Sequence, residues 1–255
     1  MVGSLTGKKG LVVGIANEAS IAWGCAQAFA SQGAELAVTY LNEKAKPYVQ
    51  PLAYQVAAPI FAPLDVTQPD QMDAVFQMIS ERWGQLDFLL HSIAFAPKTD
   101  LHGRLLDSSR EGFLSAMDIS CHSLIRLAHA AEQRMQAGGS ILTLSFYGAH
   151  RVVPHYQLMG PVKAALESSV RYLAAELGPG QIRINAISPG PISTRAASGL
   201  LEFEQLRQQS IERNPLHQAI TTEQVGQLAA FLVSDQARQI TGQVLYVDAG
   251  DHIMG

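Results

Sequence analysis

The sequence predicts a doubly wound α/β fold, with helices on both faces of a parallel seven-stranded sheet. Two observations support this prediction. Short apolar runs alternate with longer segments of helical periodicity, and no repeat, linker or low-complexity tract interrupts the alternation. The 255 residues are 47% hydrophobic and 16% charged, which suits one large buried core. We therefore expect a single domain over residues 1–255.

The expected strands are short and continuously apolar, as strands are when helices bury both faces of a parallel sheet. They are Leu11–Val13, Glu35–Tyr40, Pro59–Leu64, Phe88–Ser92, Ser140–Leu144, Arg183–Ile187 and Val244–Val247. The expected helices between them are Ile21–Gln32, Gln68–Trp83, Arg110–Met135, Val162–Leu177 and Glu223–Ser234. Ligands bind beyond the carboxyl ends of the strands in such sheets. The residues that follow each run are therefore the candidates for a site.

Composition argues against several classes of protein. The formal net charge is -4 and no basic run occurs, so neither nucleic acid nor an anionic membrane is an expected partner. No apolar run approaches the ~20 residues that span a bilayer, and Met1–Lys9 lacks the apolar segment of a secretory signal. Cys25 and Cys121 lie in apolar helical patterns, which predicts buried free thiols and a cytoplasmic protein.

Histidines offer no metal site by spacing. His122 and His129 are seven residues apart in a helical pattern, but no third ligand follows at metal-binding spacing. We expect no metal.

The turn after the first strand is a candidate phosphate-binding loop. Gly14 permits a tight turn, and Gly24 permits close packing of the following helix against the sheet. Ser20 and Ile21 stand at the start of that helix, where a hydroxyl and backbone N–H groups can meet a phosphate. The pattern is not G-x-G-x-x-G, so a turn without a ligand is an alternative.

Two later segments favour a Rossmann-like dinucleotide site. Asp65 and Val66 end the third strand, where a carboxylate can accept a hydrogen bond from adenine, although an acid before a helix is the alternative. Ser92, Ile93 and Ala94 follow the fourth strand with mostly small side chains, which would let the chain pass close to a ribose.

The end of the second strand bears on the choice of cofactor. A 2′-phosphate calls for an arginine or a close pair of lysines. Leu41 and Asn42 provide neither, Glu43 would repel a phosphate, and Lys44 is expected to be a solvated helix residue. The sequence therefore favours NADH over NADPH.

Tyr156 and Lys163 form the candidate catalytic pair. They are seven residues apart, within roughly 20° of two full helical turns, so both can face one cleft. Pro161 is tolerated only in a first helical turn, which places Tyr156 at or just before the helix start. Tyr156 can donate a hydrogen bond to an oxygen that gains negative charge. Lys163 can hold a ribose and would favour a phenol more acidic than the free value of about 10.

The chain as a whole resembles the bacterial enoyl-acyl carrier protein reductases, a divergent branch of the short-chain dehydrogenases and reductases. The resemblance runs from Gly7 to Asp248. It is carried by Gly14–Gly24, Ser92–Ala96, Tyr156-x-x-Met159-x-x-x-Lys163 and Asn185–Thr194. The wider superfamily usually has tyrosine four residues before the lysine. Met159 stands there in this chain, which indicates the enoyl reductase branch.

The resemblance implies that NADH gives a hydride to the β-carbon of a trans-2-enoyl thioester while Tyr156 stabilises the enolate oxygen. Ile192 and Thr194 would contact the nicotinamide amide and the phosphates. The substrate loop would span about residues 190–210, with Ala196–Leu206 as a mobile helix over the acyl chain. The implied acyl-binding residues are Phe95, Ala96, Phe146, Tyr156, Met159, Ala196 and Phe203. A homotetramer is also implied.

Two departures from the family pattern concern the substrate. The family usually has a second tyrosine ten residues before the catalytic one. Phe146 stands there, and Tyr147 beside it should point to the opposite side. The family's loop helix often carries basic residues that meet the acidic carrier protein, but the matching positions are Leu201, Glu204 and Gln205. Acyl carrier protein is therefore a doubtful partner, because like charges disfavour encounter.

Three functions stay open at this point. The first is an NADH-dependent enoyl-thioester reductase of fatty acid synthesis. The second is a carbonyl or enone reductase of the same superfamily, whose substrate is not held on acyl carrier protein; Phe146 and the acidic loop favour it somewhat. The third is a dinucleotide-binding regulator without turnover, against which the pair of Tyr156 and Lys163 argues.

Overall fold

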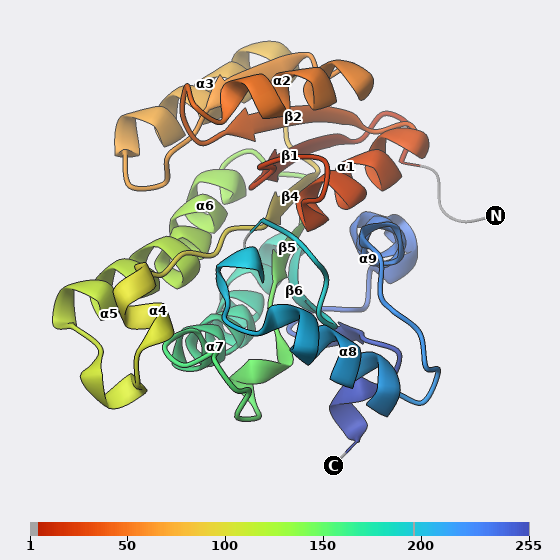
Figure 1. Ribbon diagram of the computed structural model, residues 1–255. Coiled ribbons are helices and arrows are strands. Elements are labelled where there is room, and N and C mark those ends of the chain that lie inside the picture. The colour runs from red at the N-terminus through yellow and green to blue at the C-terminus, as the bar shows by residue number, and fades with distance from the viewer. Residues whose placement is uncertain (1–4, 196, 255) are drawn as a thin grey trace.

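The computed structural model describes residues 5–195 and 197–254, and one parallel seven-stranded sheet forms its centre (Figure 1). The strands are β1 (Lys9–Val13), β2 (Glu35–Tyr40), β3 (Ile60–Pro63), β4 (Phe88–His91), β5 (Gly139–Leu144), β6 (Ile182–Pro189) and β7 (Val244–Val247). Their order is β3-β2-β1-β4-β5-β6-β7. The strand order therefore reverses between β1 and β4, as in doubly wound folds. The predicted fold class is confirmed, and the predicted strand bounds differ by a residue or two.

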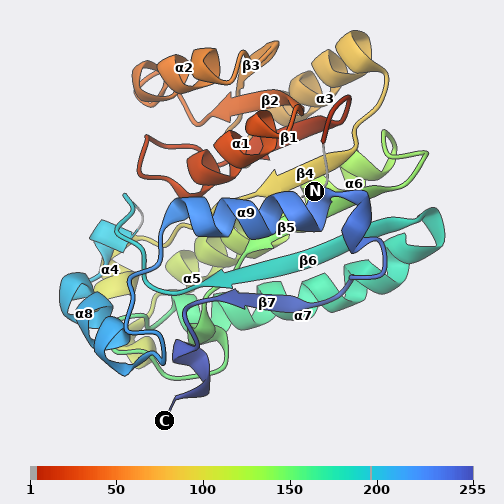
Figure 2. The ribbon, with the colours of Figure 1, turned by 90° about the vertical axis from the view of Figure 1, so that its right-hand side faces the viewer.

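Helices cover both faces of the sheet (Figures 1 and 2). One face carries α1 (Ile21–Ser31), α2 (Lys46–Gln55) and α9 (Thr222–Val233), and the other carries α3 (Pro69–Trp83), α6 (Ser123–Glu132) and α7 (Met159–Leu177). Successive residues of β1 alternate between the two buried clusters: Leu11 and Val13 join one, and Val12 joins the other. This alternation follows from the pleat of a strand.

Gly24 has a different packing role from the one expected. We expected it to bring α1 close to the sheet. Instead, a Cβ on Gly24 would lie 2.5 Å from the Thr222 carbonyl oxygen, so the glycine brings α1 against α9. Gly226 makes the matching close approach from α9 to the backbone of Gly24. Small residues on both helices permit this contact.

The expected helix Arg110–Met135 is divided in the structure. It consists of α5 (Arg110–Met117), a π-helical turn (Asp118–His122) and α6, which ends at Glu132. A π turn holds one extra residue and is often found at functional sites. Hydrophobic spacing alone does not reveal it.

Two helices lie at the carboxyl end of the sheet (Figure 2), and residues 197–213, which include the second of them, are called the lid below. The short helix α4 (Lys98–His102) follows β4, and α8 (Phe203–Arg213) follows β6. The expected mobile helix Ala196–Leu206 thus begins later and extends further, because residues 197–199 form only a 3-10 turn. Ala196 itself lies outside the described residues.

Cys25 and Cys121 are buried free thiols, as predicted. Within the described ranges, no helix is both long and apolar enough to span a membrane.

Candidate active site

A cavity of about 630 Å³ opens at the carboxyl ends of the strands, next to the point where the strand order reverses. Most of the residues singled out from the sequence line it. They are Gly14, Ser20, Ile21, Ser92, Ile93, Ala94, Phe95, Ala96, Phe146, Tyr156, Met159, Lys163, Ile192, Thr194 and Phe203. Residues that are far apart in the sequence, from Gly14 to Phe203, therefore line one cavity.

The loop after β1 is fixed by its own backbone. Gly14 has a φ of 110°, and a Cβ there would overlap the carbonyl oxygen of Ser92. The Ser20 hydroxyl accepts hydrogen bonds from the N–H groups of Ala16 and Asn17, each at 3.0 Å. Ser20 thus shapes the turn in which it stands, and the hydroxyl that we expected to meet a phosphate already has two partners in the loop.

The segment after β4 is held by the π turn. The Ser120 hydroxyl accepts a hydrogen bond from the Phe95 N–H at 2.8 Å and donates one to the Phe95 carbonyl at 3.0 Å. The hydroxyl therefore clamps the wall of the cavity. Sequence reasoning did not identify Ser120.

His91 supports the same wall from within. Its ring nitrogens lie 2.8 Å from Thr143 Oγ1 and from Ser123 Oγ, and burial lowers the pKa of His91 to about 3. The imidazole is therefore neutral and joins β4, β5 and α6 as a structural group.

Asp65 and Val66 are not among the cavity-lining residues. Asp65 Oδ1 accepts hydrogen bonds from the Thr67 N–H at 2.9 Å and the Thr67 hydroxyl at 2.7 Å, while Val66 is buried in the core. Asp65 stands at the end of β3, at the same edge of the sheet as the cavity. Its present contacts match the alternative that it organises the turn before α3.

The segment after β2 contains few free cations. Leu41 is exposed, and Asn42 Oδ1 accepts from the N–H groups of Lys44 and Ala45 at 3.1 Å. Glu43 lies 3.4 Å from Lys46 Nζ, so the lysine nearest to it already has an acidic neighbour. This arrangement suits a cofactor without a 2′-phosphate.

Tyr156 and Lys163 are brought together as predicted. Tyr156 precedes α7, and Lys163 lies in its second turn. The Lys163 ammonium donates a hydrogen bond of 2.7 Å to the Leu144 carbonyl at the end of β5. Gly148 leaves room for the phenol ring, since a Cβ there would lie 2.6 Å from it.

The electrostatics of the pair differ from the expectation. Burial raises the pKa of the Tyr156 phenol, and the negative charge of Glu167 raises it further. This direction is opposite to the more acidic phenol that we expected, and Lys163 is not among the causes of the shift. Burial also lowers the pKa of Lys163 to about 8. Tyr156 is thus a firmly protonated donor.

Phe146 and Tyr147 point to different places, as predicted. Phe146 lines the cavity, and its ring centroid lies 4.9 Å from that of Tyr156. Tyr147 is buried and does not line it. Neither residue therefore places a phenol in the cavity. Burial raises the pKa of the Tyr147 phenol.

The lid is held by side-chain contacts. Phe203 lines the cavity, and Glu202 beside it lies 3.2 Å from His155 Nε2. Glu204 accepts hydrogen bonds from the Ser193 hydroxyl at 2.8 Å and from Arg207 Nε at 2.9 Å. Both acids of the lid are therefore engaged. Leu201 is exposed.

Two basic residues also line the cavity, Lys98 and Arg195, and both are exposed. Neither makes an ion pair with another described residue. Lys98 was not identified from the sequence, because its place beside the cavity depends on how the chain turns into α4.

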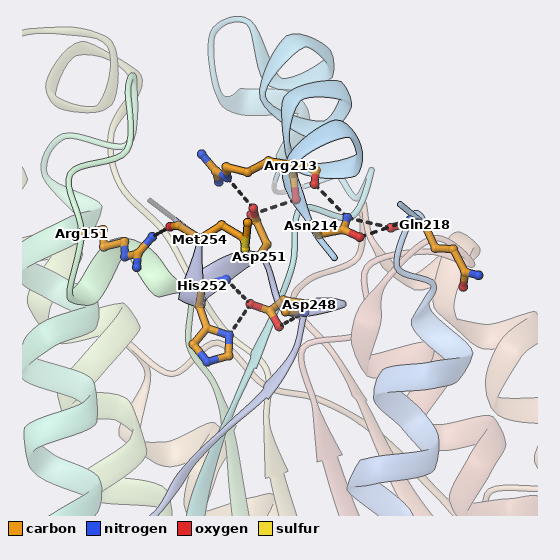
Figure 3. Close-up of polar contacts among 10 residues, drawn as sticks. Arg151, Arg213, Asn214, Gln218, Asp248, Asp251, His252 and Met254 are labelled. Atoms are coloured by element: carbon orange, nitrogen blue, oxygen red, sulfur yellow. Dashed lines mark hydrogen bonds and ion pairs between the residues drawn. The ribbon is translucent and has the colours of Figure 1, made fainter. Parts of the chain in front are cut away.

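The far end of α8 is anchored to the C-terminal segment (Figure 3). Arg213 Nε donates to Asp251 Oδ1 at 2.7 Å, and the Ser210 hydroxyl donates to Asp251 Oδ2 at 2.9 Å. Asp251 is fully buried. Arg151 also contacts the C-terminal segment, through the Met254 carbonyl. The lid helix is thus fixed at one end and lies against the cavity at the other.

No group of three potential metal ligands is present among the described residues.

Comparison with known proteins gives a consistent match. The family model described as Enoyl-(Acyl carrier protein) reductase matches residues 14–252. Enoyl-[acyl-carrier-protein] reductase [NADH] 1 of Rhizobium meliloti is 47% identical over 253 residues, covering 99% of this chain and 93% of that protein. FabI of Aquifex aeolicus is 47% identical over 255 residues, covering 100% of this chain and 94% of that protein.

Solved structures agree with these matches. The reductase of Anaplasma phagocytophilum, in complex with NAD, has a TM-score of 0.95 at 48% identity, covering 99% of this chain and 97% of that one. The Bacillus cereus enzyme, in complex with NADP+ and an indole naphthyridinone, has a TM-score of 0.96 at 44% identity, with 98% of each chain covered.

Proposed function

The chain belongs to the enoyl-(acyl carrier protein) reductase family, and we propose that its cavity reduces the carbon–carbon double bond of a trans-2-enoyl thioester with NADH. This makes it an oxidoreductase that acts on CH–CH groups in fatty acid synthesis. One observation supports the proposal most strongly: the protonated Tyr156, Lys163 and the glycine loop after β1 line the same cavity.

The cavity fits a dinucleotide. The Gly14 turn is fixed against the Ser92 carbonyl, and it lines the cavity with a residue that has no side chain. We propose that the cofactor is held by Gly14, Ser20, Ile21, Ser92, Ile93, Ala94, Lys163, Ile192 and Thr194, with Asp65 and Val66 at the adenine end. When bound, NADH supplies a hydride. Engagement of Glu43 with Lys46 supports NADH over NADPH.

Tyr156 and Lys163 have separate roles in this proposal. Tyr156 donates a hydrogen bond to the thioester oxygen as it becomes an enolate oxygen, and the raised pKa keeps the proton on the phenol until charge develops there. Lys163 is fixed by the Leu144 carbonyl and presents its remaining N–H groups to the ribose hydroxyls. It therefore positions the cofactor.

The acyl chain would lie against the apolar side of the cavity. Phe95, Ala96, Phe146, Met159 and Phe203 line that side, and Ala196 completes the proposed set. Burial of an acyl chain there excludes water and strengthens the hydrogen bond from Tyr156. Phe146 adds apolar surface where the family pattern has a hydroxyl.

Assembly and partners follow from the family in this proposal. We propose a cytoplasmic homotetramer formed by one domain over residues 1–255, with the substrate loop at about residues 190–210. The acyl group would be carried as a thioester, and an acyl carrier protein is the carrier that the relatives' names give.

An assay panel tests the proposal. NADH oxidation is measured with crotonyl thioesters, with simple ketones and without substrate. Oxidation with crotonyl thioester alone supports the enoyl reductase. Oxidation with ketones supports a carbonyl or enone reductase, which the hydrophobic Phe146 favours as a second candidate. NADH binding without oxidation in any arm would contradict both.

A further inference from the structure

Glu167 is a buried acid that the proposed roles of Tyr156 and Lys163 leave unused. It lies on α7 one turn beyond Lys163, and its side chain is 1% exposed. A carboxylate in the interior is costly unless other groups compensate for the lost water. The contacts of its two oxygens therefore indicate what it does.

One oxygen of Glu167 reaches the cavity through Ser145. The Ser145 hydroxyl donates a hydrogen bond of 2.5 Å to Glu167 Oε1. Ser145 follows β5 and lines the cavity together with Tyr156 and Lys163. The serine hydroxyl thus connects the carboxylate with the space proposed for the substrate.

The other oxygen of Glu167 faces outward. His150 Nε2 lies 2.5 Å from Oε2, which is ion-pair distance, and no N–H or O–H of a described residue is aligned for a hydrogen bond to this oxygen. The His150 side chain is 54% exposed and lines a second cavity of about 400 Å³. The imidazole therefore meets both solvent and a buried acid, and its ring nitrogens can donate or accept a proton.

We propose that His150, Glu167 and Ser145 form a proton relay that connects solvent with the active-site cavity. The inference rests on the proposed reductase reaction, because that reaction consumes one proton per turnover. The geometry points to this role: Ser145 and His150, from the segment after β5, and Glu167 of α7 span the distance between two cavities.

The relay balances the reduction. Hydride addition forms a C–H bond at the β-carbon and moves the double-bond electrons into an enolate. A water in the cavity then protonates the α-carbon, and the thioester carbonyl re-forms. The hydroxide left behind takes the Ser145 hydroxyl proton. Glu167, protonated by His150, replaces the Ser145 proton after its carboxyl group rotates, and His150 takes a proton from solvent. One proton enters and no charge accumulates.

Several charged or titratable groups face Glu167 and would act on the relay. Its negative charge raises the pKa values of Tyr156 and Tyr246, where burial is the larger cause. The same charge opposes the lowering of the Lys163 pKa by burial. Arg171 donates to the Glu167 backbone carbonyl at 3.2 Å and does not replace His150 at the carboxylate. These groups come from α7, β7 and the turn before α7.

The first test is Glu167→Gln, which keeps the size of the side chain and an oxygen for Ser145 but carries no proton. We expect turnover to fall by about 10- to 100-fold, at or below the ~10²-fold lower limit for losing a general acid or base. We also expect NADH affinity to change less than about twofold, since Glu167 does not line the cavity. The solvent isotope effect should rise, and the isotope effect of deuterated NADH should fall toward one.

The matched control is His122→Gln. His122 also pairs with a carboxylate, Asp118, at 3.3 Å, but it lies on the surface and lines neither cavity. Its turnover should equal that of the wild type. If Glu167→Gln folds, keeps wild-type turnover and shows no change in either isotope effect, the relay is overturned.

A second variant, at an exposed residue, tests the relay even if Glu167→Gln does not fold. His150→Ala opens space at the surface, so added imidazole can enter and replace the missing ring. We expect lowered turnover that imidazole restores in proportion to its concentration. Full activity without imidazole, or a loss that imidazole leaves unchanged in a folded protein, contradicts the proposal.

A measurement independent of turnover completes the test. The His150 ring signals are recorded by NMR in wild type and in Glu167→Gln, without cofactor. Loss of the carboxylate 2.5 Å from Nε2 should move these signals, and unchanged chemical shifts argue against direct contact. Wild-type activity on crotonyl thioester is measured in parallel. Its absence would refute the reductase, whereas an active wild type with unaffected variants would refute the relay alone.

Discussion

The cofactor end and the lid end of the cavity are held in place by different kinds of contact. At the cofactor end, backbone meets backbone: Gly14 lies against the Ser92 carbonyl. At the lid end, side chains from distant segments meet, as Glu202 does with His155 and Arg213 with Asp251 (Figure 3). Exposed ion pairs contribute about 0–1 kcal/mol each. The exposed contact between Glu202 and His155 can therefore open at little cost, whereas Arg213 holds the far end of α8 to the buried Asp251.

The difference also determines what sequence reasoning can find. Close backbone approach requires glycine at particular positions, so it leaves a pattern in the sequence. A contact between Arg213 and Asp251 requires only that two common residues meet after folding. We expect substitutions at the cofactor end to affect cofactor binding strongly, and substitutions at the lid end to affect substrate capture mildly.

The largest effect is expected where the two ends meet, at Tyr156. Tyr156→Phe removes the hydrogen-bond donor and keeps the ring that packs on Phe146. Turnover should fall by the ~10²- to 10³-fold typical of losing one oxyanion donor, with NADH affinity unchanged. Steady-state kinetics and an NADH titration measure the two effects. Equal loss of both would show that the phenol serves binding and not the transition state.

Gly14→Ala tests the fixed backbone. The added Cβ would overlap the Ser92 carbonyl, and the φ of 110° is unfavourable for alanine. Strain of about 1–3 kcal/mol corresponds to a loss of NADH affinity of roughly 5- to 150-fold if it falls on the bound state. Gly7→Ala, at a glycine with a φ of 83°, open space around it and no place in the cavity lining, is the matched control and should leave NADH affinity unchanged. Calorimetric titration of both variants decides the matter.

The seven strands and the meeting of Tyr156 and Lys163 in one cavity could be predicted, because apolar runs indicate buried strands and a spacing of seven residues places two side chains on one helix face. The helix α2 was missed because Pro47 and Pro51 stand in a segment of ten residues, and proline is the poorest helix former. The π turn was missed because one extra residue per turn hardly changes a hydrophobic pattern.

The polar supports of the site were harder to find. Glu167 lies in a helix with a clear apolar face, where an acid suggests a solvated position, yet it is buried. The contact of Ser120 with the Phe95 backbone could not be predicted, because it depends on how the π turn between α5 and α6 packs beside the segment after β4. The phenol pKa was misjudged because burial of Tyr156 depends on Gly148 and Phe146, and both contacts are tertiary.

Cofactor binding should also depend on pH through Lys163. Burial lowers its pKa from 10.5 to about 8, so the ammonium loses its proton as pH rises through about 8. A charged lysine donates to ribose hydroxyls better than a neutral amine, so NADH affinity should weaken above that pH. We expect NADH affinity to fall by up to about tenfold, which corresponds to about 1.4 kcal/mol of lost interaction. Titrations between pH 6 and 10 test this. Lys163→Ala should bind weakly at every pH, and a flat wild-type profile would contradict the assignment.

The anchor of the lid should show a smaller effect. Arg213→Ala leaves the buried Asp251 with Ser210 as its remaining side-chain partner. Because Arg213 is itself more than one-third exposed, we expect a loss of stability of about 1–2 kcal/mol, below the 3–5 kcal/mol of a fully buried pair. KM for the thioester should rise a few-fold with NADH affinity unchanged. Arg207→Ala, which breaks an exposed pair on the same helix, should change stability by at most about 0.5 kcal/mol. Equal effects of both variants would show that α8 has no special anchor.

The smallest effect concerns the acyl carrier. Carrier proteins are acidic, and a basic mouth normally steers them. In this chain Glu202 contacts His155, and Glu204 contacts Ser193 and Arg207, so these acids repel a carrier less than the sequence suggests. The exposed Lys98 and Arg195 provide modest attraction.

Electrostatic steering acts on association and ranges from about 10- to 1,000-fold, so we expect a carrier preference below tenfold that changes only a few-fold with salt. The test compares kcat/KM for one enoyl chain on carrier protein and on a small thiol, at low and high salt, with Lys98→Ala as the variant. A preference above about 100-fold that collapses with salt would show that steering comes from surfaces beyond the lid, because the lid itself carries too little net positive charge to produce it.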